Sequence, residues 1–302
     1  MATSVAPPMQ AELRNRLIAG PVLGAATITA LVADMAFNTS WGALAVALVI
    51  AITATPEFVA LARGPAGRPV RAPLFTANIL LPLIAVPDIH RALLERLPTE
   101  PVALVLGVCL VWAALLQTTR GIEGFIHGLG GTVLGMLYIG LSMHLLVALG
   151  AHDTPLNPVR GTQLLLTALA VCKLGDVAAF FGGRACGRHK MAPSISPGKT
   201  WEGFGFSLVG SIAAAYLTVY LVSGPWMRYP VAPFSGYWQP LAFGLAVGPA
   251  GVMGDLVESC LKRSSAVKDS GSIVPGFGGF LDVYDAILLS VPVACLLTLL
   301  SG

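Results

Sequence analysis

Long apolar runs, separated by short polar connections, recur along the whole chain. Each run holds roughly 17 or more residues, which is the length that an α-helix needs to cross the hydrocarbon core of a bilayer. The run at 73–89 is the weakest, because its "LFTANILLPLIAVP" is short and contains two prolines. The pattern predicts nine membrane-spanning helices, over residues 17–35, 41–62, 73–89, 101–117, 127–149, 162–182, 203–222, 239–257 and 279–300.

The composition excludes an ordinary soluble domain. Of the 302 residues, 55% are hydrophobic and 11% are charged, whereas soluble domains carry about 25% charged residues. The expected fold class is therefore an all-α integral membrane protein, a bundle of about nine transmembrane helices. The net charge of +3 is too small to indicate a nucleic-acid partner. Because no small-residue cleavage site follows the first run, we expect a retained helix there and not a signal peptide.

The distribution of Lys and Arg predicts the orientation of these helices. Nine spans place 13 of the 18 cations on the side of the N-terminus and four on the other. Since cytoplasmic loops carry the excess of positive charge, the N-terminus is expected to be cytoplasmic. The polar segments 183–202 and 258–278 then face the cytoplasm. We divide the single membrane unit into residues 1–160 (spans 1–5) and residues 161–302 (spans 6–9).

Several ionisable residues lie within or at the edge of the predicted spans. Each costs about 2.5–3.5 kcal/mol at the centre of a bilayer, so it requires a partner or a wet cavity. They form three pairs spaced i,i+3, each on one helix face: Lys173 with Asp176, Asp255 with Glu258, and Asp282 with Asp285. Lys173 and Asp176 could instead have a purely structural role, in which they neutralise charges elsewhere and hold helices together. Asp282 and Asp285 have no cation close in sequence, and their mutual repulsion favours a divalent metal, for which carboxylate oxygens suit Mg²⁺.

Cations gather beside these acids, on two loops. Lys262, Arg263 and Lys268 lie on one, and Arg188, Lys190 and Lys199 lie on the other. Phosphate is the expected ligand of such a ring. Any cytoplasmic loop would be basic, so the cations alone say little about function. Carboxylates for a metal together with cations for phosphates are a far more specific indication of phosphate chemistry.

The "SPGKTWEG" stretch at 196–203 resembles a phosphate-binding P-loop but fails its spacing. The G-x-x-x-x-G-K-[ST] pattern requires glycine at position 193, where the chain has Pro193, and we expect no strand before it. We predict a Pro-Gly turn that displays Ser196, Lys199 and Thr200 just before a helix. Backbone N–H groups there could bind an anion.

These motifs together resemble the phosphatidate cytidylyltransferase (CDP-diacylglycerol synthase) family. "GDVAAFFGGRACGRHKMAPSI" before "SPGKTWEG", "GDLVES" and "SCLKRSSAVKDSGSIVPGFGGFLDVYD" carry the likeness, over roughly residues 160–290. The C-terminal signature of that family runs S-x-x-K-R-x4-K-D-x-G and then P-x-H-G-G-x-x-D-R-x-D. Matching positions are Ser259, Lys262, Arg263, Lys268, Asp269, Gly271, Pro275, Gly278, Gly279, Asp282 and Asp285.

The resemblance implies a Mg²⁺-dependent transfer, with room for a second cation, in a cell (inner) membrane. The phosphate of phosphatidic acid would attack the α-phosphate of CTP, releasing pyrophosphate and forming CDP-diacylglycerol. Asp255, Asp282 and Asp285 would then hold the metal, and Lys262, Arg263, Lys268 and Asp269 would be catalytic. Substrate binding would fall to Ser196, Lys199, Thr200, Arg188, Lys190 and Ser259.

Two departures from the signature leave alternatives open. Phe277 stands where the family has histidine, and Val283 where it has arginine. Both substitutions could be tolerated, or the chain could use another lipid phosphate or have weak activity. A CTP-dependent transferase or kinase acting on an isoprenoid lipid, a transporter and a non-catalytic scaffold are the rival hypotheses. The sequence leaves the lipid chain preference, the role of Glu57 and a homodimer open.

Overall fold

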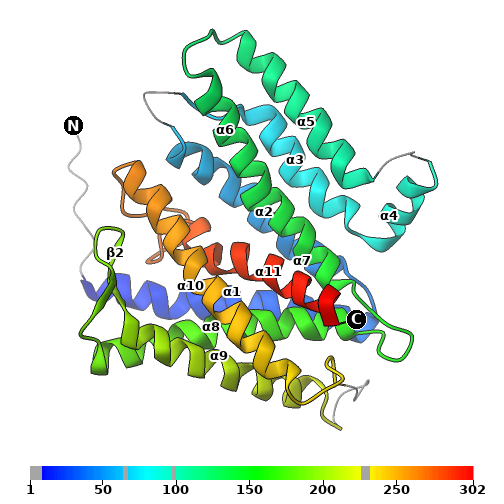
Figure 1. Cartoon of the computed structure of the whole chain (residues 1–302), viewed down its shortest axis with the longest axis vertical. Coiled ribbons are helices and arrows are strands. Elements are labelled where there is room, and N and C mark those ends of the chain that lie inside the picture. Colours follow the sequence, from blue (N-terminus) through cyan, green and yellow to red (C-terminus); the bar gives the residue numbers. More distant parts are fainter. Residues whose placement is uncertain (1–8, 64–66, 97–99, 226–231, 302) are drawn as a thin grey trace.

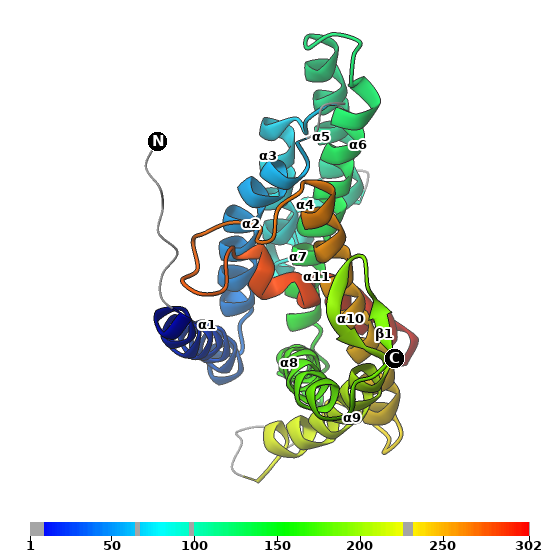
Figure 2. The same ribbon diagram turned by 90° about the vertical axis from the view of Figure 1, so that its left-hand side faces the viewer.

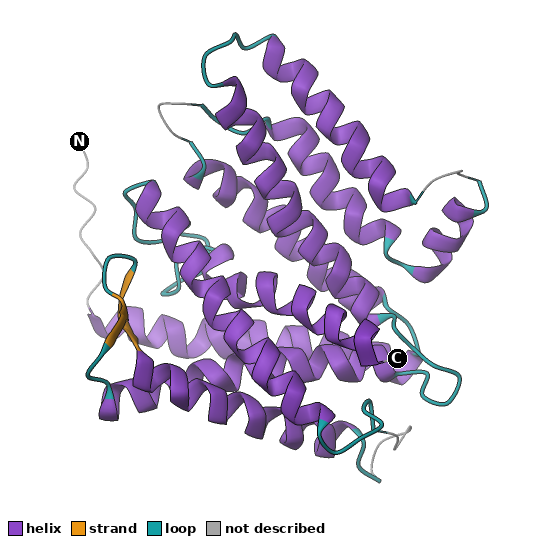
Figure 3. Ribbon diagram, in the orientation of Figure 1, coloured by secondary structure: helices purple, strands orange, loops and turns teal. Residues whose placement is uncertain are grey.

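The computed structural model of the chain describes residues 9–63, 67–96, 100–225 and 232–301, without the side chains of 9–17 and 301. Within these ranges the protein is almost wholly helical (Figures 1 and 3). Among the described residues, eight helices are long and apolar enough to cross a membrane, or nine if one bent pair counts as a span. The expected all-α membrane bundle is thus confirmed. The helices are α1 Met9–Phe37, α2 Trp41–Leu61, α3 Arg71–Ile84, α4 Pro87–Leu94, α5 Pro101–Thr118, α6 Phe125–Gly135, α7 Ser142–Gly150, α8 Arg160–Cys186, α9 Trp201–Val222, α10 Gln239–Ser264 and α11 Leu281–Ser301.

The bent pair consists of α3 and α4. It corresponds to the predicted span 73–89, which has the weakest sequence signal. The prediction of a single helix over 73–89 is wrong, because α3 ends at Ile84 and α4 leaves at an angle of 98°. Val86 takes an extended conformation, which the following proline favours, and Pro87 then occupies the first turn of α4. The short α4 has no buried residue, so it lies at the edge of the bundle.

The fifth predicted span is continuous but not uniformly α-helical. A π-helical segment, η1 Met136–Leu141, joins α6 to α7, so that one apolar run extends over Phe125–Gly150. Extra backbone residues of this kind are rare in helices and frequently occur at functional sites. This segment contacts α2, α3 and α11, and it therefore lies inside the bundle.

The two strands pair as an antiparallel hairpin, β1 Lys190–Ala192 with β2 Ser196–Thr200. The expected Pro-Gly turn over "SPGKT" is therefore wrong, since this stretch is the second strand. The expectation that no strand precedes it is wrong too, although Pro193 still excludes a P-loop. Thr200 ends β2 and caps α9, because its hydroxyl accepts a hydrogen bond from Gly203 N at 3.1 Å.

One apolar core connects the two halves of the chain. Phe58, Leu81, Met143, Leu165 and Leu281 are all fully buried in it. In the C-terminal half, α9 packs against α8 and α10, and α10 packs against α11 (Figures 1 and 2). Exposed apolar side chains cover the outer faces of these helices, as expected for contact with lipid tails: Val177, Phe181, Val209, Leu245 and Leu299.

Candidate active site

The first turn of α11 is held by a carboxylate from the other half of the chain. Glu57, near the end of α2, is buried and accepts hydrogen bonds from Phe280 N at 3.0 Å and Leu281 N at 2.8 Å. Its Oε2 also accepts a hydrogen bond from Ser270 Oγ at 3.1 Å. An anion that satisfies free N–H groups at a helix N-terminus stabilises that helix. Sequence reasoning left Glu57 without a role, and the fold assigns it to anchoring the start of α11.

Asp282 organises the loop between α10 and α11. Its Oδ2 accepts hydrogen bonds from Ser270 N at 2.8 Å, Ser270 Oγ at 2.7 Å and Gly279 N at 2.8 Å. Gly278 has a φ of +105°, and a Cβ there would lie 2.7 Å from Asp282 Oδ2. The glycine of the signature is therefore required for the loop to close around this carboxylate.

Lys262 bridges α10 and α11 through two acids. Its Nζ lies 2.6 Å from Asp282 Oδ1 and forms an ion pair with Glu258, one turn earlier on α10. Glu258 is fully buried, and the side chains of Lys262 and Asp282 are nearly so. Buried ions of opposite charge stabilise each other only when paired closely, as they are in this triad. Both oxygens of Asp282, one of the three predicted metal ligands, are therefore already engaged by protein groups.

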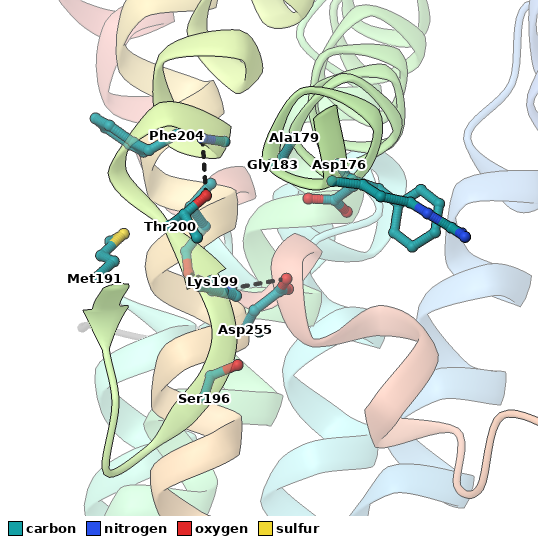
Figure 4. A pocket seen from close by; sticks show the side chains of 14 residues that line it. Asp176, Ala179, Gly183, Met191, Ser196, Lys199, Thr200, Phe204 and Asp255 are labelled. Carbon is teal, nitrogen blue, oxygen red and sulfur yellow. Dashed lines mark hydrogen bonds and ion pairs between the residues drawn. The ribbon is translucent and has the colours of Figure 1, made fainter. Parts of the chain in front are cut away.

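A cavity of about 520 Å³ lies between the hairpin and helices α8, α9 and α10. Figure 4 shows Lys199 reaching from β2 toward Asp255, with Asp176 of α8 directed into the same space. Lys199 Nζ lies 3.1 Å from Asp255 Oδ2 and donates to Val252 O at 3.1 Å. Both side chains keep about a quarter of their surface exposed, so the pair faces the cavity. Ser196 and Thr200 also line it, as does Arg184, which the sequence analysis did not single out.

Acidic side chains from three helices influence one another electrostatically here, and two of them, Asp176 and Asp255, line the cavity. Asp255 of α10 interacts electrostatically with Asp176 of α8 and with Asp285 of α11. Lys173 acts on both of these flanking acids and donates a hydrogen bond to Val283 O at 2.9 Å. We call Asp176, Asp255 and Asp285 the acidic cluster. It sits in the part of the chain that spans the membrane, where uncompensated negative charge is unfavourable.

The other predicted residues do not line the cavity. Arg263 ties α10 to the hairpin instead, because its Nε donates to Ile195 O at 3.3 Å. Glu202 similarly holds the start of the hairpin, by accepting hydrogen bonds from the backbone N–H groups of Arg188 and His189. Four further predicted residues lie outside the cavity lining, and all but the partly buried Ser259 are exposed: Lys190, Ser259, Lys268 and Asp269.

The acidic cluster is compatible with magnesium. Among the described residues, no three His, Cys, Asp or Glu side chains are already gathered as a metal site. Mg²⁺ does not require such a cage, because one or two carboxylates, waters and substrate phosphates commonly complete its shell. Asp255 and Asp285 supply two carboxylates from adjacent helices, and Lys199 beside them could bind a phosphate. The hard oxygen donors of this pair therefore fit the ion.

Comparisons with known proteins agree with the sequence motifs. A sequence model described as "Cytidylyltransferase family" matches residues 14–301. An uncharacterized protein, YnbB, of Escherichia coli (strain K12) is 39% identical over 133 residues, which is 44% of this chain and 41% of that protein. A phosphatidate cytidylyltransferase of Haemophilus influenzae is 35% identical over 45% of this chain and 46% of its own length. One of Brucella suis is 34% identical over 61% and 62%, so the matched region spans between two fifths and two thirds of these relatives.

Proposed function

The chain belongs to the cytidylyltransferase family, and we propose that it transfers the cytidylyl group of CTP to the phosphate of a membrane lipid. The lipid is phosphatidic acid, as in the names of several relatives. A phosphate oxygen of the lipid attacks the α-phosphorus of CTP. The bond between the α-phosphorus and the oxygen that bridges it to the β-phosphorus then breaks. Pyrophosphate leaves, and CDP-diacylglycerol stays in the membrane. The reaction contributes to phospholipid synthesis.

One observation carries this proposal. Lys199 and Asp255 lie 3.1 Å apart at a cavity of about 520 Å³, next to two further carboxylates. A cation for phosphates and acids for a metal thus meet at one opening, within a bundle that can hold a lipid. Phosphoryl and nucleotidyl transfer depend mainly on such positioning and neutralisation of charge.

The residues of the chain divide this work between them. Lys199 and Arg184 bind and neutralise the triphosphate, while Ser196 and Thr200 contribute hydroxyl groups at the cavity wall. Asp255 and Asp285 would hold Mg²⁺, and Asp282 would become a third ligand only if its Oδ1 released Lys262. The bound ion would neutralise charge on the α-phosphate and on the leaving pyrophosphate. Lys262 and the loop that bears Lys268 keep the start of α11 in place.

The location of the reaction follows from the charge distribution. We place the cavity on the cytoplasmic side of the inner membrane, where CTP is available and where the excess of Lys and Arg lies. The exposed apolar side chains on the outer helix faces do not by themselves separate acyl from prenyl chains. A homodimer remains a prediction.

Purified protein incubated with labelled CTP, Mg²⁺ and a panel of lipid phosphates tests this function directly. We expect label in a lipid product with phosphatidic acid and little with isoprenoid phosphates. Transfer to an isoprenoid alone would identify the other substrate class, and no lipid product from any member would refute the proposal. Asp285→Asn should abolish turnover while the protein stays folded, with Asp88→Asn, an exposed acid on α4, as the matched control.

A further inference from the structure

Tyr138 is a buried tyrosine whose hydroxyl has no protein partner. It lies in η1, keeps 7% of its surface exposed and packs its ring against Phe58, with the ring centroids 6.4 Å apart. Among the described residues, Oη finds no donor or acceptor within hydrogen-bond distance. A buried hydroxyl in this state destabilises a fold, because it has lost its hydrogen bonds to water and has formed none within the protein. Such groups are rare in native proteins, and a bound water or ion is one of the explanations for them.

The surroundings of this hydroxyl indicate which ligand that is. The charges of Asp285, Glu258 and Asp255 all act on it. Two of the three belong to the acidic cluster, and η1 contacts α11, so the hydroxyl lies near that cluster. Glu258 is fully buried against Lys262, whereas Asp255 keeps about a quarter of its surface exposed beside Lys199, so Asp255 and Asp285 are the acids that can share a ligand with the tyrosine.

The backbone explains how the hydroxyl reaches this position. η1 interrupts the α-helical repeat between α6 and α7, and the interruption changes the direction in which the following side chains point. The ring of Phe58 lies against Tyr138. Phe58 directly follows Glu57, which anchors the start of α11. Tyr138 and the start of α11, the helix that carries Asp285, therefore both contact the same part of α2.

We propose that Tyr138 is a positioning residue of the metal site. Its hydroxyl donates a hydrogen bond to an oxygen held by a divalent cation between Asp255 and Asp285. That oxygen is a water before the nucleotide binds and a phosphate oxygen afterwards. The inference rests on the proposed function, because it needs the ion. Hydrogen bonds from outside the direct ligands orient them, and their loss commonly weakens metal binding by about tenfold or more.

Tyr138→Phe removes only the hydroxyl and keeps the ring against Phe58. With Mn²⁺ alone, followed by electron paramagnetic resonance on purified protein, we expect the variant to bind about tenfold more weakly than the parent. Its thermal midpoint without metal should stay unchanged or rise, since an unpaired buried group has been removed. Repeating the titration with a non-hydrolysable CTP analogue distinguishes a bond to water from a bond to phosphate.

Tyr284→Phe is the matched control. Tyr284 is equally buried, at 7% exposed, but its hydroxyl lies 3.3 Å from Thr27 Oγ1 and is thus already paired. This variant should lower the thermal midpoint and leave Mn²⁺ affinity intact. Equal Mn²⁺ affinity of Tyr138→Phe and the parent, with and without the analogue, would overturn the inference alone. Failure of the parent protein to bind Mn²⁺ would overturn the metal site of the proposed function as well.

Discussion

Glu57→Gln tests whether one buried carboxylate holds the signature loop and the start of α11. The substitution keeps the size of the side chain and removes its charge. In the parent, Oε1 accepts from Phe280 N, and Oε2 accepts from Leu281 N and Ser270 Oγ. A glutamine has one side-chain oxygen, which can replace either Oε1 or Oε2 as the acceptor but not both. Its NH₂ group must then face at least one donor N–H.

The magnitude follows from the groups that lose their partner. One hydrogen bond to a charged acceptor is worth about 1.5–3 kcal/mol, and an anion at a helix N-terminus adds about 0.3–1 kcal/mol. Glu57 is 5% exposed, so water cannot replace the lost acceptor. We therefore expect the free energy of unfolding to fall by about 2–4 kcal/mol.

Denaturant unfolding of the purified protein in one detergent measures this change. Nucleotide turnover should fall in parallel, because the loop that carries Lys268 and the turn that presents Asp282 and Asp285 both lose their anchor. Asp88→Asn is the control, since its exposed ion pair with Arg91 should contribute almost nothing. Unfolding of Glu57→Gln at the same denaturant concentration as the parent would refute the capping role.

Two further substitutions test the cavity and the loop. Lys199→Met should raise the KM for CTP about tenfold or more, because a charge-assisted contact to phosphate is lost, and steady-state kinetics with varied CTP would show it; an unchanged KM would place the nucleotide elsewhere. Gly278→Ala should lower stability by about 1–3 kcal/mol, since φ is +105° there and the new Cβ would lie 2.9 Å from Asp269 Cβ. An unaltered melting temperature in the same detergent would show that the loop can rearrange.

The membrane bundle was accessible from the sequence because length and hydropathy decide it. An apolar run long enough to cross the bilayer must satisfy its backbone polar groups internally, and an isolated segment can do this only as a helix. The bend between α3 and α4 was not accessible in the same way. Pro82 and Pro87 weakened the prediction, but the angle of 98° depends on the packing of α3 against α2 and α5.

Local sequence predicted a chemistry for the site but not the partners of its side chains. The spacing of Asp282 and Asp285 placed both acids on one turn, and the acid-rich and base-rich stretches indicated phosphate and metal. Asp282 nevertheless turns inward to Lys262 and the loop backbone, whereas Asp285 approaches Asp255. Asp282 and Asp285 both lie near the start of α11, so their local sequence does not separate them. Packing decides which carboxylate faces the loop and which faces a helix.

Residues far apart in the chain explain the remaining features. Glu57 and Tyr138 lie outside every motif, and no local pattern distinguishes them from ordinary polar residues in a span. Only the folded bundle brings Glu57 to the N–H groups of α11 and Tyr138 to the acids of α10 and α11. The chain by itself determined that charges must be compensated inside a membrane, because hydrocarbon cannot solvate them. The tertiary structure decided which groups compensate which, because hydrogen bonds and ion pairs act only over a few ångströms.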